Sequence, residues 1–102
     1  MKVAFYCRAP YSGTQTIFEQ ETMLLHCMKA MNASLYAIYV DHQSKENLEK
    51  RPAFSLLTSD ARKNCFQELL CVNPEIFGSP SEESFPVPIH YAQPERKENP
   101  EP

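Results

Sequence analysis

The first segment of the chain, Lys2-Val3-Ala4-Phe5-Tyr6-Cys7-Arg8, limits most strongly what this sequence can fold into. Its middle residues are apolar, without the alternation of a strand that has one face in water. The turn-forming residues Pro10-Tyr11-Ser12-Gly13 follow at once. The pattern predicts a buried parallel strand that runs into a loop at the carboxyl edge of a sheet, where ligands and catalytic groups collect in α/β folds.

Two helices and two further strands are predicted behind this segment. Thr16-Ile17-Phe18-Glu19 has the form of a capping box and begins a helix over about 17–32. Residues 35–40 are rich in β-branched and aromatic side chains and predict a second strand that ends at Asp41. Pro52 suits the first turn of a helix that runs to about Lys63, and residues 65–72 predict the third strand.

This order of elements predicts a three-layer α/β domain with a small, mainly parallel sheet flanked by helices. Right-handed crossovers place the first strand in the middle, in the order 2-1-3, which is half of a doubly wound fold. The apolar island at residues 85–91 could add an edge strand or serve as an extended ligand for a partner. Packing is favoured, because a three-stranded sheet leaves apolar surface uncovered.

The composition changes near residue 80 and suggests a boundary there. The chain has 102 residues, enough for one small domain, and six of its nine prolines lie from Pro80 onward. We therefore expect a domain over residues 1–80 and a tail rich in proline and glutamate over 81–102. Residues 92–102 are predicted to be disordered.

The charge distribution argues against tight, independent binding of duplex DNA. The whole chain has a net charge of −3, and the tail alone accounts for it, with five glutamates against Arg96 and Lys97. Residues 1–80 are neutral, so neither segment has the basic excess that releases counterions from phosphates. No apolar run approaches the length of a membrane span and no signal-peptide pattern is present, so a cytoplasmic protein without membrane contact is expected.

The cysteines, histidines and paired tyrosines have ordinary interpretations. Four cysteines lack C-x-x-C spacing, so reduced thiols that pack as small apolar groups are favoured over a metal site that also uses His26 or His42. No metal or cofactor is predicted. Tyr36 and Tyr39 are three positions apart in a strand, which predicts that they face opposite sides and disfavours a stacking platform for bases.

Several short motifs occur in an order that resembles one family. Tyr6 and Arg8 match Tyr-x-Arg-x-Ser, and residues 16–20, Thr-Ile-Phe-Glu-Gln, look like Ser-Ile-x-x-Gln at the start of a helix. Tyr39-Val40-Asp41 is similar to the end of that family's second strand, and Arg51-Pro52-Ala53-Phe54 matches Arg-Pro-x-Phe, the strongest of these likenesses. Over residues 1–72 the chain thus resembles the N-terminal catalytic domain of the serine recombinases, the resolvase/invertase family.

The resemblance implies attack of a serine on a DNA phosphate, but the position expected for that serine holds another residue. In that family a serine attacks a DNA phosphate to form a phosphoserine, and arginines neutralise the developing charge. Arg8 and Arg51 stand at two of those arginine positions, whereas Pro10 stands where the serine belongs. Because the loop is one residue longer than usual, a shifted gap would align Ser12 with the nucleophile.

A second family signature is also altered. The Asp-Arg-x-x-Arg motif of the serine recombinases falls on residues 75–79, where Glu75 keeps the acid but Ile76 and Ser79 replace both arginines. The long dimerising helix and the carboxyl-terminal DNA-binding module of the family have no counterpart in this sequence. The resemblance therefore implies a truncated, degenerate resolvase-like domain, a pseudoenzyme in which strand exchange is not expected.

Three functions follow as hypotheses. The first is a regulatory or partner-binding domain, whose partner is a full-length recombinase or a second copy of the chain, with DNA bound only weakly or through that partner. The second is an active DNA-cleaving domain that uses Ser12, Arg8 and Arg51. The third is a small anion-binding module in which Arg8 and Arg51 hold a phosphate; against it, both arginines could simply pair with Asp41 and Glu75.

Overall fold

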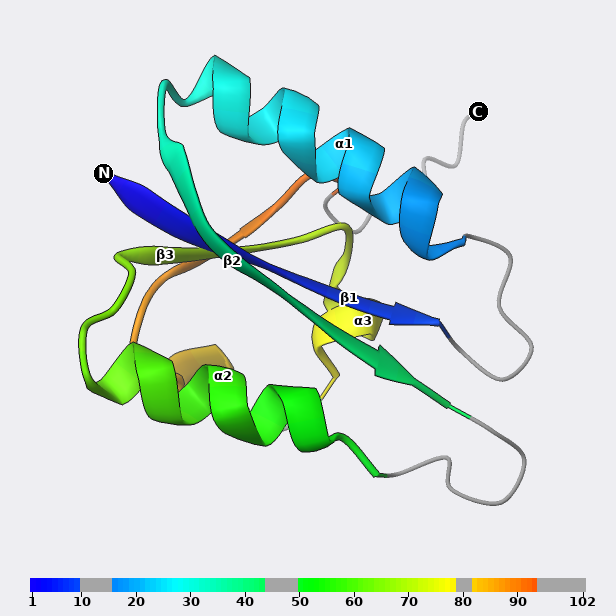
Figure 1. Cartoon of the computed structure of the whole chain (residues 1–102), viewed down its shortest axis with the longest axis vertical. Helices are drawn as coiled ribbons and strands as arrows, with labels where there is room; N and C mark the ends of the chain where they lie inside the picture. Colours follow the sequence, from blue (N-terminus) through cyan, green and yellow to red (C-terminus); the bar gives the residue numbers. More distant parts are fainter. Residues whose placement is uncertain (10–15, 44–49, 79–81, 94–102) are drawn as a thin grey trace, which may run out of the picture.

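A single parallel sheet between two helices forms the domain. The computed structural model describes residues 1–9, 16–43, 50–78 and 82–93. The strands are β1 (Lys2–Ala9), β2 (Ser34–His42), β3 (Glu68–Cys71) and β4 (Ile89–Tyr91). They are hydrogen-bonded in the order β2-β1-β3-β4. Helix α1 (Ile17–Ala30) covers one face and α2 (Pro52–Arg62) the other (Figure 1). The predicted three-layer α/β class with a central first strand is confirmed, and β4 is the added edge strand.

Strand β1 is enclosed on every side, as its apolar sequence predicts. All five residues from Val3 to Cys7 are buried. Strand β2 pairs with one edge of β1 and β3 with the other, both in parallel. A strand that is covered on both faces needs apolar side chains at successive positions. Because β1 is longer than β3, its last residues, Cys7 to Ala9, pair only with β2 and reach the carboxyl edge of the sheet.

The start of α1 follows its sequence signal. The Thr16 hydroxyl accepts a hydrogen bond from the Glu19 main chain, and the Glu19 carboxylate accepts one from the Thr16 main chain, which completes the capping box. The helix ends at Ala30, two residues before the predicted end. Asn32 takes a left-handed conformation with φ 58°, and that conformation ends a helix.

The start of α2 depends on a residue from another element. Arg51 occupies the capping position but makes no capping hydrogen bond through its side chain. Asp41, at the end of β2, supplies the cap instead: its carboxylate accepts hydrogen bonds from the main chains of Ala53 and Phe54 at 2.8 and 3.0 Å. The same carboxylate accepts the Tyr6 hydroxyl at 2.8 Å. One buried acid thus connects β2, α2 and β1.

The third strand is shorter than residues 65–72. Residues 63–65 form the turn out of α2, with Asn64 at φ 61°, and the buried Phe66 ring points into the core. Gln67 already bonds to the start of β1, since its main chain donates to the Lys2 carbonyl at 2.8 Å and its side chain accepts from the Lys2 main chain at 2.7 Å. Regular pairing begins only at Glu68, because the chain must first turn Phe66 inward.

The prediction that Tyr36 and Tyr39 face opposite sides is wrong. Both rings contact the Phe66 ring, at centroid distances of 6.0 and 6.3 Å. The reason is a bulge in β2, where the pairing with β1 passes from Leu35 directly to Ala37. The extra residue at Tyr36 reverses the alternation of side chains, so the odd spacing places both rings on one face.

The segment that follows β3 packs against the sheet. A short helix, α3 (Pro74–Phe77), is capped by Asn73, and a 3-10 turn, η1 (Glu82–Ser84), precedes β4. The buried Phe85 ring contacts Phe54 at 6.0 Å and Phe77 at 5.4 Å. After β4, the main chains of Ala92 and Gln93 donate to Cys71 and Val72, while the rest of the segment with predicted disorder, 94–102, lies outside the described residues.

Within the described residues, no helix is both long enough and apolar enough to cross a bilayer.

Replacement of Asp41 by alanine is expected to destabilise the domain by about 2–4 kcal/mol, because two helix N–H groups and the Tyr6 hydroxyl lose their buried acceptor. The free energy of unfolding from urea titration measures this. Asp60→Asn is the matched control, since asparagine still offers an oxygen to the Tyr39 hydroxyl that Asp60 now accepts at 2.6 Å. An equal loss in both variants would contradict the assigned role of Asp41.

A chain that ends at residue 93 is expected to be as stable as the full chain, whereas one that ends at residue 80 loses both β4 and Phe85. Phe85→Ala alone should cost about 3 kcal/mol, the usual loss for a buried phenylalanine. Thermal unfolding by circular dichroism compares these three variants with the full chain. Full stability of the chain that ends at residue 80 would mean that the domain is complete without β4.

Candidate functional site

Two arginines from distant parts of the chain converge at the carboxyl edge of the sheet. Arg8 lies near the end of β1 and Arg51 directly precedes α2. Between them lies Gly78, which follows α3 and has φ 70°. A methyl group on Gly78 would lie 3.2 Å from Nη2 of Arg8 and 3.3 Å from Nη1 of Arg51. Glycine at this position therefore allows both guanidinium groups to reach the same place.

Arg8 is fixed through both its main chain and its side chain. The Gln20 amide, buried in α1, accepts from the Arg8 main-chain N–H at 3.1 Å and donates to its carbonyl at 2.8 Å. The guanidinium donates through Nη2 to the Glu75 main-chain carbonyl at 2.6 Å. Burial, and next the charge of Arg51, lower the pKa of Arg8 from its ordinary value. Two like charges are therefore held close together.

Arg51 is held by aromatic rings and neutral acceptors. Its guanidinium carbon lies 3.9 Å from the centre of the Phe54 ring, a cation–π contact. Its Nε donates to the Tyr6 hydroxyl at 3.3 Å, and its Nη2 donates to the Phe77 main-chain carbonyl. The Tyr6 hydroxyl in turn donates to Asp41, so Tyr6 links Arg51 to that acid. Burial is the main cause that raises the pKa of Tyr6, which keeps the hydroxyl protonated as a donor.

Of the two acids that could have paired with the arginines, Asp41 has other contacts. The Asp41 carboxylate caps α2 and accepts Tyr6. The Arg8 guanidinium contacts Glu75 only through the Glu75 main-chain carbonyl, which is neutral. Nε of Arg8 is buried and has no hydrogen-bond partner among the described residues. Arg8 is thus positioned mainly by neutral groups, and its positive charge remains at the sheet edge.

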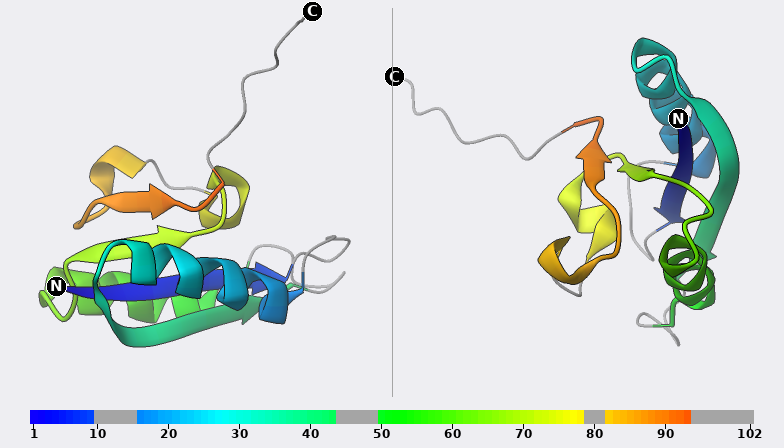
Figure 2. Two further views of the ribbon diagram at one scale, coloured as in Figure 1. Left: turned by 90° about the horizontal axis from the view of Figure 1, so that it is seen from above. Right: turned by 90° about the vertical axis from the view of Figure 1, so that its left-hand side faces the viewer.

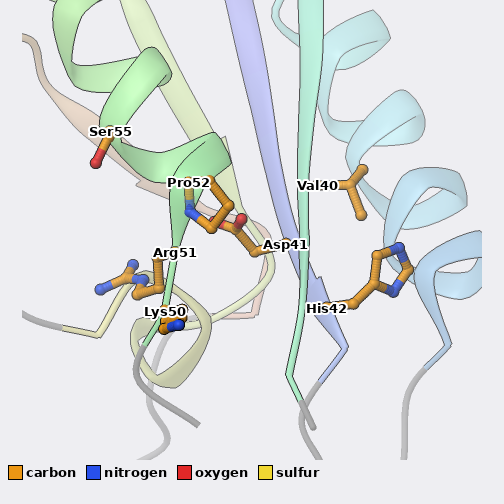
Figure 3. A pocket seen from close by; sticks show the side chains of 7 residues that line it. All are labelled: Val40, Asp41, His42, Lys50, Arg51, Pro52 and Ser55. Atoms are coloured by element: carbon orange, nitrogen blue, oxygen red, sulfur yellow. The ribbon is translucent and has the colours of Figure 1, made fainter. Parts of the chain in front are cut away.

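An open hollow adjoins this cluster (Figure 3). It has a volume of about 530 Å³. Its walls come from the end of β2 and the start of α2: Val40, Asp41, His42, Lys50, Arg51, Pro52 and Ser55. Lys50 and Arg51 contribute positive charge on the α2 side of the hollow, whereas the His42 ring points to the other side of β2 (Figure 3). Cations of this kind can contact an anion.

Solved structures with a fold similar to that of this chain are known. No family model and no curated protein matches the sequence. Among solved structures, the N-terminal catalytic domain of TP901-1 integrase is similar, with a TM-score of 0.66 and 26% identity over 83% of this chain and 63% of that one. The C-terminal catalytic domain of ISC1926 TnpA, an IS607-like serine recombinase, has a TM-score of 0.77 and 14% identity, over 92% of this chain and 72% of that one.

The chain has the serine recombinase catalytic-domain fold. The resemblance drawn from the short motifs is confirmed at this level. The chain spans 63% of the length of the integrase domain, so the activity of a whole recombinase is not carried over with the fold.

Within the recombinase fold, the substituted positions lie in apolar or undescribed places. Ile76 is buried in the core beside Phe77, so the position that the resemblance assigns to an arginine is occupied by an apolar side chain. Pro10, Ser12 and Ser79 lie outside the described residues. Ser12 is therefore a candidate from sequence alone, whereas Arg8 and Arg51 are brought together by the fold.

Sequence reasoning missed two residues that shape the site. Gly78 was noted only as part of the altered motif over residues 75–79. Asn73-Pro74 is a common start of a helix, and a glycine shortly after it, as at Gly78, is a common sign that the helix ends. Gln20 was noted only as the last residue of a family motif, and its double hydrogen bond to Arg8 had no sequence signal beyond that motif. Both residues act by positioning arginines.

The cysteines do not form a reactive or metal-binding centre in the described residues. No three His, Cys, Asp or Glu side chains of that part of the chain lie together as a metal site would need. Burial raises the pKa of the Cys7 thiol to about 12, so Cys7 is a protonated core residue.

Inorganic phosphate is expected to bind beside the two arginines and to shift the amide signals of Arg8 and Gly78 in NMR spectra. Arg8→Gln should weaken binding about tenfold, the usual worth of one charge-assisted hydrogen bond. Gly78→Ala should also weaken it, because the added methyl group displaces the guanidinium groups. Arg62→Gln, at the far end of α2, is the control. Spectra that do not move at high phosphate would exclude an anion site here.

Proposed function

We propose that this chain is a serine recombinase-type domain that does not exchange DNA strands itself and acts as a regulatory or partner-binding domain. One observation carries the proposal: Ile76, at a family arginine position, lies in the apolar core. A phosphoryl-transfer site depends on cations aimed at the phosphate in the transition state, and the arginine that completes a GTPase site raises the rate by about 10³ to 10⁵. With Ile76 and Ser79 at both positions of the later motif, that charge is missing from these two positions.

The remaining arginines support a passive role toward phosphate. Arg8 and Arg51 are directed to one place by Gln20, Tyr6, Phe54 and two main-chain carbonyls. Two guanidinium groups can hold a phosphate without breaking its ester bonds, since bond breaking also needs an activated nucleophile. This second candidate function, an anion-binding module, is favoured by the convergence of Arg8 and Arg51 beside Gly78. It is compatible with a domain that contacts DNA while a partner provides most of the affinity.

The charge of the chain supports dependence on a partner. Its net charge is −3, and the domain portion is neutral, so the counterion release that drives independent DNA binding is small. A full-length recombinase, or a second copy of the chain, would supply the missing cationic surface or the second half of an assembly.

Covalent attachment to DNA is the test of this proposal. The full chain, incubated with supercoiled plasmid and then denatured, is expected to leave no protein on the DNA, under conditions in which an intact serine recombinase forms a phosphoserine linkage with its own site. Attachment that disappears in Ser12→Ala would overturn the proposal and establish the active alternative. Ser55→Ala, which removes a hydroxyl that lines the hollow beside Arg51, is the matched control.

A further inference from the structure

We propose that Arg8 and Arg51 bind a phosphate monoester on a partner protein, namely the side chain of a phosphorylated serine or threonine. The inference rests on the anion-binding role proposed above and deepens the partner-binding role, because it names the chemical group that the partner presents. It also distinguishes this ligand from the phosphate of a DNA strand, which is a diester.

The place where the two arginines meet is accessible from solvent. Gly78 is exposed, whereas Arg8 and Arg51 are partly buried. Figure 2 shows α3, the helix that Gly78 follows, at the end of the molecule where β1 and β3 finish, and α3 contacts β1. A group that approaches Gly78 from solvent therefore meets both guanidinium groups at the carboxyl edge of the sheet.

One phosphate group can contact both arginines. Nη2 of Arg8 and Nη1 of Arg51 lie 3.2 and 3.3 Å from the same point, the position of a methyl group on Gly78, so the two nitrogens are no farther apart than the sum of these distances. Nη2 of Arg8 keeps an N–H for a ligand, since it donates only the other one to the Glu75 carbonyl. A charge-assisted hydrogen bond from such a nitrogen to a phosphate oxygen is about 2.8 Å long. Two of these bonds, made to different oxygens of one phosphate, span that separation.

The charge of the site suits a monoester better than a diester. A phosphorylated side chain carries about 1.5 to 2 negative charges at pH 7, and its phosphate has three acceptor oxygens, whereas each DNA phosphate carries one charge. The Arg8 guanidinium forms no ion pair with the described residues, and the charge of Arg51 lies beside it. A dianion compensates two adjacent positive charges more fully than a monoanion does.

The surroundings of Gly78 disfavour a DNA duplex as the ligand. Acidic residues occur in the elements on both sides of it in the chain, Glu75 in α3 and Glu82 and Glu83 in η1. A DNA strand presents a row of phosphates, and tight binding needs a basic surface that continues from one phosphate to the next. A phosphorylated side chain presents one phosphate, so these acids do not have to face a second one.

The hollow beside Arg51 can take the residues next to the phosphorylated side chain. Lys50, Pro52 and Ser55 line it on the same side of β2 as Arg51 (Figure 3). Lys50 favours an acidic residue of the partner, Pro52 offers apolar surface, and the Ser55 hydroxyl can hydrogen-bond to a main chain. Sites for small molecules enclose most of their ligand, whereas this hollow is open. The hollow therefore fits an extended peptide segment better than a small phosphate ester.

Two small compounds test the preference for a monoester. N-acetyl-phosphoserine amide is the monoester and dimethyl phosphate the diester, and each is titrated into the full chain while NMR follows the amide signal of Gly78. We expect the monoester to bind about tenfold more tightly, because it has the larger charge. Arg8→Gln should remove most of that preference, whereas Arg62→Gln, at the far end of α2, should keep it. Equal affinities of the two compounds for the unaltered chain would overturn the proposal.

A short synthetic peptide tests the kind of partner. It carries one phosphoserine flanked by glutamate and leucine, and fluorescence anisotropy compares it with its unphosphorylated form and with a DNA duplex at physiological ionic strength. We expect the phosphopeptide to bind about tenfold more tightly than the small monoester, and the unphosphorylated form not to bind. Lys50→Gln should weaken the peptide about threefold more than it weakens the small monoester. Circular dichroism checks that each variant is folded.

Two other ligands could occupy the site, and each gives a result that contradicts the proposal. A duplex that binds more tightly than the phosphopeptide, and loses affinity in Arg8→Gln, would identify DNA as the ligand. A phosphopeptide that binds no more tightly than inorganic phosphate would identify a free anion. Inorganic phosphate also separates this inference from the role on which it rests. If it shifts the Gly78 signal while monoester and diester bind equally, only the inference is wrong. If none of the three binds, the anion-binding role is wrong as well.

Discussion

The Asp41 carboxylate is the contact on which the arrangement of this domain depends. It lies at the carboxyl end of β2, caps the first turn of α2 and accepts the hydroxyl of Tyr6 from β1. A buried carboxylate is costly to desolvate, and here two helix N–H groups and a hydroxyl compensate it. Because α2 begins at this acid, Arg51, the residue before α2, is directed to the same sheet edge as Arg8.

The site that results combines cationic and apolar features. Burial, and next the charge of Arg51, lower the pKa of Arg8, and the two guanidinium groups are held by an aromatic ring, a tyrosine hydroxyl and main-chain carbonyls. Such repulsion costs stability, and folds retain it where an anion can relieve it. Ile76 nevertheless packs into the core next to this cluster, so the edge has fewer cations than the serine recombinase motif implies. The proposed contact of Arg8 and Arg51 with phosphate, together with the smaller number of charges, agrees with the proposed partner-dependent role.

Much of the fold could be predicted because its signals are local. The apolar run at Val3–Cys7, the Thr16–Glu19 capping box and Pro52 each fixed an element, and the order of those elements fixed the parallel sheet with β1 inside. The bulge at Tyr36 could not be predicted, because it arises from how β2 pairs with β1. The late start of β3 likewise follows from the inward turn of Phe66, a packing requirement of the assembled core. Of the candidate site residues, Arg8 and Arg51 were found through a family resemblance, while Gly78 and Gln20 acquire their roles only through distant contacts.

The sequence by itself determined the class of the fold and the residue types available for chemistry, because hydrophobic periodicity and helix-capping motifs act over a few residues. Through the family resemblance it also predicted that Pro10, Ile76 and Ser79 stand where the family has a serine and two arginines. Only the tertiary structure decided that Arg8 and Arg51 meet beside Gly78 and that Asp41 caps a helix. These features join residues far apart along the chain, and their geometry exists only when the sheet has brought its strand ends together.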